Sequence, residues 1–270
     1  MKVACHFDPD NRRSTRIAKA MMTGINACGD EAHAVAGWIN QTWADVGLAY
    51  GWAHPDVMTA YRRYVHVDLG WWDRKPEGAV LDGYHKVCVN RRMPPPLGGM
   101  GYPSDRFDRF GLKIAPWRQG GGPIILAGMS AKSAHTRGLG PQEWEMSAVL
   151  RLRAVTNRPV IYRPKPSWVD AKPIPGTLFS KGEAIEAVLA GAWALVTLHS
   201  NAAIDALLAG VPIHVDEGPA ALFSTKLEQI ESPRTPDGRE QLMADIAWHQ
   251  FSVPEMETGV CWKHVREQIQ

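Results

Sequence analysis

Polar and glycine-containing segments follow four apolar runs in the second half of the chain, and their side chains could bind a phosphorylated ligand. The apolar runs at residues 123–128, 159–163, 194–198 and 211–215 have the length of buried strands. The residues at their ends that could contact a ligand are Gly128, Ser130, Lys132, Arg163, Lys165, His199, Ser200, Asn201 and Glu217. Small residues let the backbone approach a diphosphate, cations neutralise it, and a helix N-terminus donates N–H groups.

Helical patterns separate these runs. Helices are predicted at 141–154, at 183–190 and from Ser200 or Asn201 to about 209, with two more at 239–250 and 255–268. Alternation of strands and helices is typical of a parallel sheet with right-handed crossovers, in which ligands bind beyond the carboxyl ends of the strands. The pattern therefore brings the four polar segments to one edge of a sheet.

The first half has a strand–helix pattern of its own. Strands are predicted at 3–7, 34–38, 46–52, 64–69 and 85–90, and helices from Ser14 to about residue 28 and from 55 to 64. Proline- and glycine-rich stretches at 91–102 and 120–123 place a domain junction near residue 118. We expect one domain over 1–118, a second over 119–250, and a C-terminal helix over 251–270 that crosses back to the first.

The amino-acid composition and the absence of certain motifs exclude or disfavour several classes of protein. The 30 Lys and Arg nearly balance the 28 Asp and Glu, which excludes a strongly basic nucleic-acid coat and an acidic tail protein. The 4 cysteines form no CxxC pair, so neither a zinc knuckle nor a disulfide scaffold is expected. With no apolar stretch of transmembrane length and no signal-peptide pattern, we expect a cytoplasmic protein. No GxGxxG follows a strand and no GxxxxGKS occurs, which disfavours dinucleotide oxidoreductases and P-loop kinases.

One segment carries a family resemblance. Residues 199–212 read HSNAAIDALLAGVP: a strand ends, a short apolar helix follows, glycine stops it, and proline opens the next strand. This segment resembles the donor site of glycosyltransferases of the GT-B fold, in particular capsular-polysaccharide and Kdo-transferase-like proteins and phage-encoded glycosyltransferases. Tyr162-Arg163-Pro164-Lys165-Pro166 and Glu217-Gly218-Pro219 look like parts of the same site. Gly51-Trp52, Asp68-Leu69-Gly70-Trp71-Trp72 and residues 85–90 resemble the phage-type proteins.

The resemblance implies an α/β fold of GT-B type, with two Rossmann-type lobes, parallel sheets and a cleft between them. It also implies a nucleotide sugar, with a UDP-sugar expected, bound to the C-terminal lobe. Helix dipoles and cations would stabilise the diphosphate leaving group without a tightly bound metal. Asp205 would either bind a ribose hydroxyl or hold a neighbouring loop.

The family mechanism also needs a base from the N-terminal lobe. Asp8 is the first candidate because it follows the first strand at its carboxyl end, although Asp-Pro-Asp-Asn can equally shape a turn. Asp73, Asp68 and His85 are further candidates.

Charge guides the choice of acceptor. Residues 1–135 carry 17 basic and 12 acidic side chains, and residues 136–270 carry 13 and 16. Interleaved cations and aromatics suit phosphate contacts and base stacking. The alternatives are that the arginines merely solvate loops and that the two adjacent tryptophans pack one inward and one outward. The residues assigned to this role are Arg12, Arg13, Arg16, Trp71, Trp72, Arg74 and Arg91.

These observations predict a glycosyltransferase that modifies a hydroxymethylated pyrimidine in phage DNA, in the host cytoplasm, with the base flipped out of the duplex. The alternatives are transfer to a capsular or surface glycan, a sugar-nucleotide epimerase of the same fold, and a non-enzymatic binding module that retained the fold.

Overall fold

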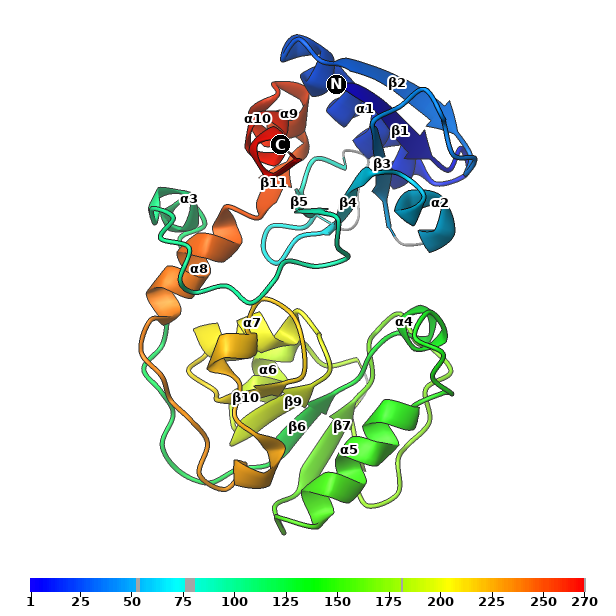
Figure 1. Ribbon diagram of the computed structural model, residues 1–270. Helices are drawn as coiled ribbons and strands as arrows, with labels where there is room; N and C mark the ends of the chain where they lie inside the picture. Colours follow the sequence, from blue (N-terminus) through cyan, green and yellow to red (C-terminus); the bar gives the residue numbers. More distant parts are fainter. Residues whose placement is uncertain (52–53, 76–80, 181, 270) are drawn as a thin grey trace. The chain divides into compact units, whose positions relative to one another are not determined.

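A computed structural model describes residues 1–51, 54–75, 81–180 and 182–269. The chain forms two compact units: Met1–Pro95 together with Ile246–Gln270, and Pro96–Asp245 (Figure 1). The junction predicted at residue 118 lies inside the second unit, and the last 25 residues belong to the first. Trp52, one of the residues behind the phage-type resemblance, lies outside the described residues.

The first unit contains a six-stranded sheet in the order β11-β5-β4-β3-β1-β2. Strands β1 to β4 are parallel, whereas β5 is antiparallel to both of its neighbours. The strands are β1 (Lys2–Phe7), β2 (Glu31–Ala36), β3 (Val46–Tyr50), β4 (Arg63–Leu69), β5 (Tyr84–Val89) and β11 (Gln250–Ser252). The sequence pattern predicts the first five of these strands but not β11, which is only three residues long.

Three helices pack on one face of this sheet: α1 (Arg12–Ala27), α9 (Val253–Glu257) and α10 (Val260–Ile269). Ile17, Met21 and Ile25 project from α1 into a core that also contains Trp262 of α10. Helix α2 (Pro55–Thr59) is shorter than the predicted helix 55–64. A single C-terminal helix was expected over 255–268, but Gly259, with φ +80°, lies between α9 and α10. Ser252 and Glu255 form a capping box that starts α9.

Helix α1 begins earlier than predicted. Asn11, not Ser14, is its cap, because the Asn11 side chain accepts the N–H groups of Arg13 and Ser14. The buried Ser14 hydroxyl instead accepts the N–H of Asp8 at 3.0 Å. This hydrogen bond therefore joins the end of β1 to the first turn of α1.

The second unit contains an all-parallel sheet in the order β10-β9-β6-β7-β8. Its strands are β6 (Ile124–Ala127), β7 (Val160–Arg163), β8 (Leu178–Phe179), β9 (Ala194–Thr197) and β10 (Ile213–Val215). Its helices are α3 (Asp105–Asp108), α4 (Ala131–His135), α5 (Glu143–Arg153), α6 (Ile185–Leu189), α7 (Ala202–Leu208), most of α8 (Arg239–Ala247) and the 3-10 turns η1 (Ala221–Phe223) and η2 (Leu227–Gln229). The described helices include none that is long and apolar enough to cross a membrane.

The core of the second unit forms where α5 and η2 pack on the sheet. Ala148, Val149 and Leu152 of α5 contact residues of β6, β7 and β9, and Tyr162 is fully buried among them. Because the strands are parallel, the loops that follow β6, β7, β9 and β10 leave the sheet at one edge, which we call the carboxyl edge.

Candidate functional site

The loop after β6 is held in a fixed conformation at the carboxyl edge. Residues 128–133, which include the first turn of α4, contain three of the predicted donor-binding residues, and we call this segment the donor loop. Ser130 caps α4, and its hydroxyl accepts the N–H of Ser133 at 3.1 Å. Lys132 is exposed and Gly128 is buried. A Cβ on Gly128 would lie 3.0 Å from the Tyr162 ring and 3.1 Å from Glu145 Oε1. The glycine is therefore required by internal packing, and its predicted contact with a phosphate stays a prediction.

The loop after β9 is bonded directly to the donor loop. His199 Nε2 lies 2.8 Å from the hydroxyl of Ser133, a buried residue of α4. Ser200 accepts the N–H of Ala202 through its hydroxyl at 3.2 Å. Asn201 occupies the cap position of α7, but its side chain makes no capping bond. Two of the predicted ligand-binding segments thus lie together, as the parallel order β9-β6 requires.

The loop after β10 joins the same cluster. Glu217 pairs with Arg137 at 2.5 Å, and Arg137 follows α4. Asp216 accepts the indole N–H of Trp144 at 2.9 Å and lies 3.1 Å from His214 Nε2. The close His214 imidazole and, after it, the hydrogen bond from Trp144 lower the pKa of Asp216. Sequence reasoning did not single out Ser133, Arg137 and Asp216, because their partners His199, Glu217 and Trp144 lie more than sixty positions away.

Arg163 ends β7 with its guanidinium half-buried. One of its terminal nitrogens donates to the carbonyl of Glu183 at 2.9 Å, while Nε is buried and has no partner among the described residues. Burial lowers the pKa of Arg163, and the nearby carboxylates, among them Asp205 of α7, oppose that shift. Lys165 is exposed. Arg163 thus has hydrogen-bonding capacity that none of the described residues uses.

In the first unit, Asp8 lies at the carboxyl end of β1, half-buried and beside the start of α1. Its Oδ1 accepts the N–H of Asp10 at 3.0 Å, so the side chain does shape a turn. A turn role that uses one carboxylate oxygen leaves the other oxygen for a substrate proton. Both interpretations of Asp8 therefore remain compatible with its geometry.

His85 has a different environment. It is fully buried; its Nδ1–H donates to the Gly83 carbonyl at 2.8 Å, and Nε2 accepts from the Arg13 guanidinium at 3.4 Å. Burial, followed by the charge of Arg13, lowers the pKa of His85 to about 4. The imidazole is therefore neutral with both nitrogens engaged, which makes it a poor base for an acceptor hydroxyl.

The remaining acids lie in loops or at strand ends. Asp73 has φ +43°, its carbonyl accepts the N–H of Tyr84, and its carboxylate is 3.9 Å from Lys75 Nζ. Asp68 ends β4, bonds the N–H of Leu69 and lies 3.9 Å from Lys86. Neither acid is held as closely to the end of a parallel strand and a helix start as Asp8 is.

The features that suggested a DNA acceptor are weaker in the structure. Trp71 and Trp72 are only 3% and 7% exposed, so their rings are not available for stacking on a base. Arg16 forms ion pairs with Asp82 and Glu257, and Arg13 faces His85. Arg12 and Arg91 are exposed, and Arg74 is half-buried.

The charge split also disappears at the structural boundaries. The first unit contains 14 basic and 13 acidic residues, and the second contains 16 and 15, so each has a net charge of +1. Residues 96–135, which fold with the second unit, carry three of the five excess positive charges of residues 1–135, and the acidic excess of residues 246–270 offsets one more.

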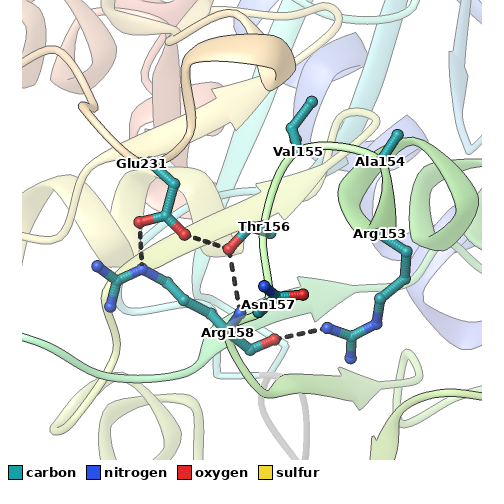
Figure 2. Close-up of a pocket in the computed structure, with 7 residues that line it drawn as sticks. All are labelled: Arg153, Ala154, Val155, Thr156, Asn157, Arg158 and Glu231. Carbon is teal, nitrogen blue, oxygen red and sulfur yellow. Dashed lines mark hydrogen bonds and ion pairs between the residues drawn. The ribbon is translucent and has the colours of Figure 1, made fainter.

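A separate pocket of about 650 Å³ lies at the opposite edge of the second unit's sheet (Figure 2). It is lined by residues 153–158, which precede β7, and by Glu231. Arg158 stacks on Trp193 at 3.9 Å and donates to Glu231 at 2.9 Å, while Arg153 donates to the Arg158 carbonyl at 2.7 Å. Its charged side chains thus bind one another and the backbone, which is a structural role.

No described cluster of three or more His, Cys, Asp or Glu side chains is placed to hold a metal ion. The predicted absence of a tightly bound metal stays a prediction.

Solved structures resemble this fold. A beta Kdo 2,7 transferase, KpsC of Thermosulfurimonas dismutans, matches with a TM-score of 0.56 and 11% identity over 97% of this chain and 99% of that one. The KpsC beta Kdo 2,4 transferase of the same organism matches with a TM-score of 0.55 and 12% identity over 93% and 91%. The chain has a GT-B-type α/β fold. No family model and no curated protein matches the sequence.

The predicted fold class is thereby confirmed, with one qualification: the first unit's sheet becomes antiparallel at β5. A UDP-GlcNAc 2-epimerase of Methanocaldococcus jannaschii matches with a TM-score of only 0.32 and 9% identity over the whole of both chains, which is too low to bear on the epimerase alternative.

Proposed function

We propose that this protein transfers a sugar from a nucleotide sugar to a hydroxyl acceptor, and that the nucleotide sugar binds at the carboxyl edge of the second unit. The observation that carries the proposal is the convergence of the four loops at this edge within a GT-B-type fold. The donor loop bonds to the loop after β9 through Ser133 and His199, and the loop after β10 reaches Arg137. Ligands of open parallel sheets bind at this edge.

The chemistry follows from the charged groups at this edge. During transfer, the bond between the sugar's anomeric carbon and the phosphate oxygen breaks, and negative charge develops on the leaving nucleoside phosphate (a diphosphate for UDP- and dTDP-sugars). Arg163, with its unused Nε–H, and the exposed Lys132 and Lys165 are the cations that would stabilise this charge. His199 is placed to donate or accept a hydrogen bond beside them.

The acceptor hydroxyl must lose a proton as its oxygen bonds to the anomeric carbon. We propose Asp8 as the base, because it combines a half-buried carboxylate with a position at the end of β1. The engaged nitrogens of His85 disfavour it.

For the acceptor we propose a glycan hydroxyl. The near-neutral first unit and the buried Trp71 and Trp72 remove the physical reasons for a nucleic acid. The two KpsC structures are Kdo transferases by name, which supports transfer of a sugar. Transfer to a hydroxymethylated pyrimidine in DNA is the alternative result that the test below can detect.

The test incubates the protein with UDP-, CMP- and dTDP-sugars and with two acceptor sets, oligosaccharides and hydroxymethylated DNA. Products are identified by mass spectrometry. A glycosylated oligosaccharide that forms with wild type and not with Asp8→Asn supports the proposal. Transfer only to DNA would contradict the glycan acceptor, and hydrolysis or isomerisation of the donor without transfer would favour an epimerase.

A further inference from the structure

Glu145 is a fully buried carboxyl group that the proposed chemistry does not use. It lies in the first turn of α5, on the side of the helix that packs on the sheet. Its Oε1 accepts the N–H of Met129 at 2.8 Å, and its buried Oε2 has no partner among the described residues. Burying a carboxyl group is costly, so a purely structural position would favour an apolar side chain.

The donor loop packs directly on the Glu145 carboxyl group. Oε1 lies 3.1 Å from the place where a Cβ of Gly128 would stand, and the buried Tyr162 fills the other side. The N–H of Gly128 donates to the carbonyl of Arg163 at 2.9 Å, which fixes the start of the loop to the end of β7. Glu145 accepts the N–H of the next residue, Met129. Two consecutive N–H groups of the donor loop are therefore hydrogen-bonded to β7 and to α5.

The rest of the loop follows from this anchor. Met129 is buried, and Ser130 comes next and caps α4 through the N–H of Ser133. The Ser133 hydroxyl then bonds His199 Nε2 at 2.8 Å. Hydrogen bonds therefore connect α5 to the loop after β9 through the donor loop. The only covalent link in this series between residues is the peptide bond from Met129 to Ser130.

We propose that Glu145 is a positioning residue that fixes the donor loop and, through Ser133, the imidazole of His199. Glu145 does not contact the nucleotide sugar. Its role is to hold Ser130, Lys132 and His199 in the positions from which they bind the donor. This inference rests on the proposed function for the donor site, whereas the hydrogen-bond series itself can be tested without any donor.

The first experiment measures amide hydrogen exchange of the full chain without ligand, in wild type, Glu145→Ala, Glu145→Gln and Glu143→Ala. Loss of the anchoring bond should speed exchange in the donor loop about tenfold in Glu145→Ala. The glutamine amide oxygen can still accept the Met129 N–H, so Glu145→Gln should restore wild-type protection. Glu143 is the matched control, because it lies in the same turn but accepts the N–H of Gly140 instead.

The second experiment covers the case in which Glu145→Ala does not fold. Ser133→Ala keeps the backbone bond to Ser130 and removes only the last link. The ¹⁵N resonance of His199 Nε2 should then shift, while exchange at Met129 stays as in wild type. Wild-type exchange in Glu145→Ala, or an unshifted His199 resonance in Ser133→Ala, overturns the inference. Faster exchange with unchanged affinity for every nucleotide sugar overturns the proposed donor site instead.

Discussion

Arg163 ends a strand at the carboxyl edge, and the part of the chain that the structure describes leaves its guanidinium Nε–H without a hydrogen-bond partner. Arg163→Ala should therefore weaken nucleotide-sugar binding by about 1.5–3 kcal/mol, the range for a charge-assisted hydrogen bond. Lys165→Ala should cost less, because Lys165 is exposed and screened. Isothermal titration with the donor measures both effects.

The control for this prediction is Arg151→Ala, which removes a cation from the exposed side of α5, where it pairs with Glu228. Its donor affinity should equal that of wild type. Equal affinity in Arg163→Ala as well would move the donor site away from β7.

Asp8→Asn should abolish turnover and leave donor affinity nearly unchanged. An asparagine oxygen still accepts the Asp10 N–H, so the turn is retained, but the amide cannot take a proton. Single-turnover kinetics compared with donor titration separates the two effects. A near wild-type rate would eliminate Asp8 and promote Asp73 or Asp68.

The buried carboxyl of Glu145 should make stability depend on pH. Burial raises the pKa of Glu145 above its ordinary value of 4.5. The protonated carboxyl therefore contributes stability that is complete below that value and is lost as the pH rises through the folded pKa. Glu145→Gln does not titrate, so the melting temperature of wild type relative to Glu145→Gln should fall as the pH rises above 4.5. A constant difference between the two would contradict a raised pKa.

Among the secondary-structure elements, α1 and α9 pack unusually closely. A Cβ on Gly24 would stand 1.9 Å from the Met256 carbonyl oxygen, a backbone atom that cannot rotate away. Gly24→Ala should therefore destabilise the first unit by about 1–3 kcal/mol, as overpacked cores do. Denaturant unfolding measures the loss, with Gly99→Ala as control because no atom lies within 4 Å of that added methyl. Equal stability of Gly24→Ala and wild type would contradict the close packing.

Most strands could be predicted because each is a short apolar run between turn residues, as at β6 and β9. The two-residue β8 and the three-residue β11 are too short to give a periodic signal. The C-terminal helix was predicted as one because a helical pattern tolerates a single glycine, and the break is visible only in the positive φ of Gly259 between α9 and α10.

The candidate site was predictable only in part. Parallel strand order brings the loops together, and this follows from the strand–helix alternation. The side-chain contacts at this edge join residues that are distant in sequence. Ser133 is hydrogen-bonded to His199, and Trp144 is hydrogen-bonded to Asp216. Burial of Trp71 and Trp72 likewise depends on tertiary packing, which two adjacent tryptophans do not reveal.

For the whole molecule, the even distribution of charge predicts weak binding to nucleic acid. Each unit has a net charge of +1. Fluorescence anisotropy with a labelled duplex over a salt series should show no specific binding. The triple variant Arg12→Ala, Arg13→Ala, Arg16→Ala should then behave as wild type. A steep salt dependence of about −0.9 per phosphate contact, flattened in the triple variant, would restore DNA as the acceptor.

The central claim is that a nucleotide sugar binds at the carboxyl edge of the second unit. Amide hydrogen exchange with and without UDP-, CMP- and dTDP-sugars tests it most directly, because the sheet has two edges to compare. We expect protection in the donor loop and in the segments after β7, β9 and β10, with none at residues 153–158 on the opposite edge. Protection confined to residues 153–158, or no protection with any nucleotide sugar, would contradict the account.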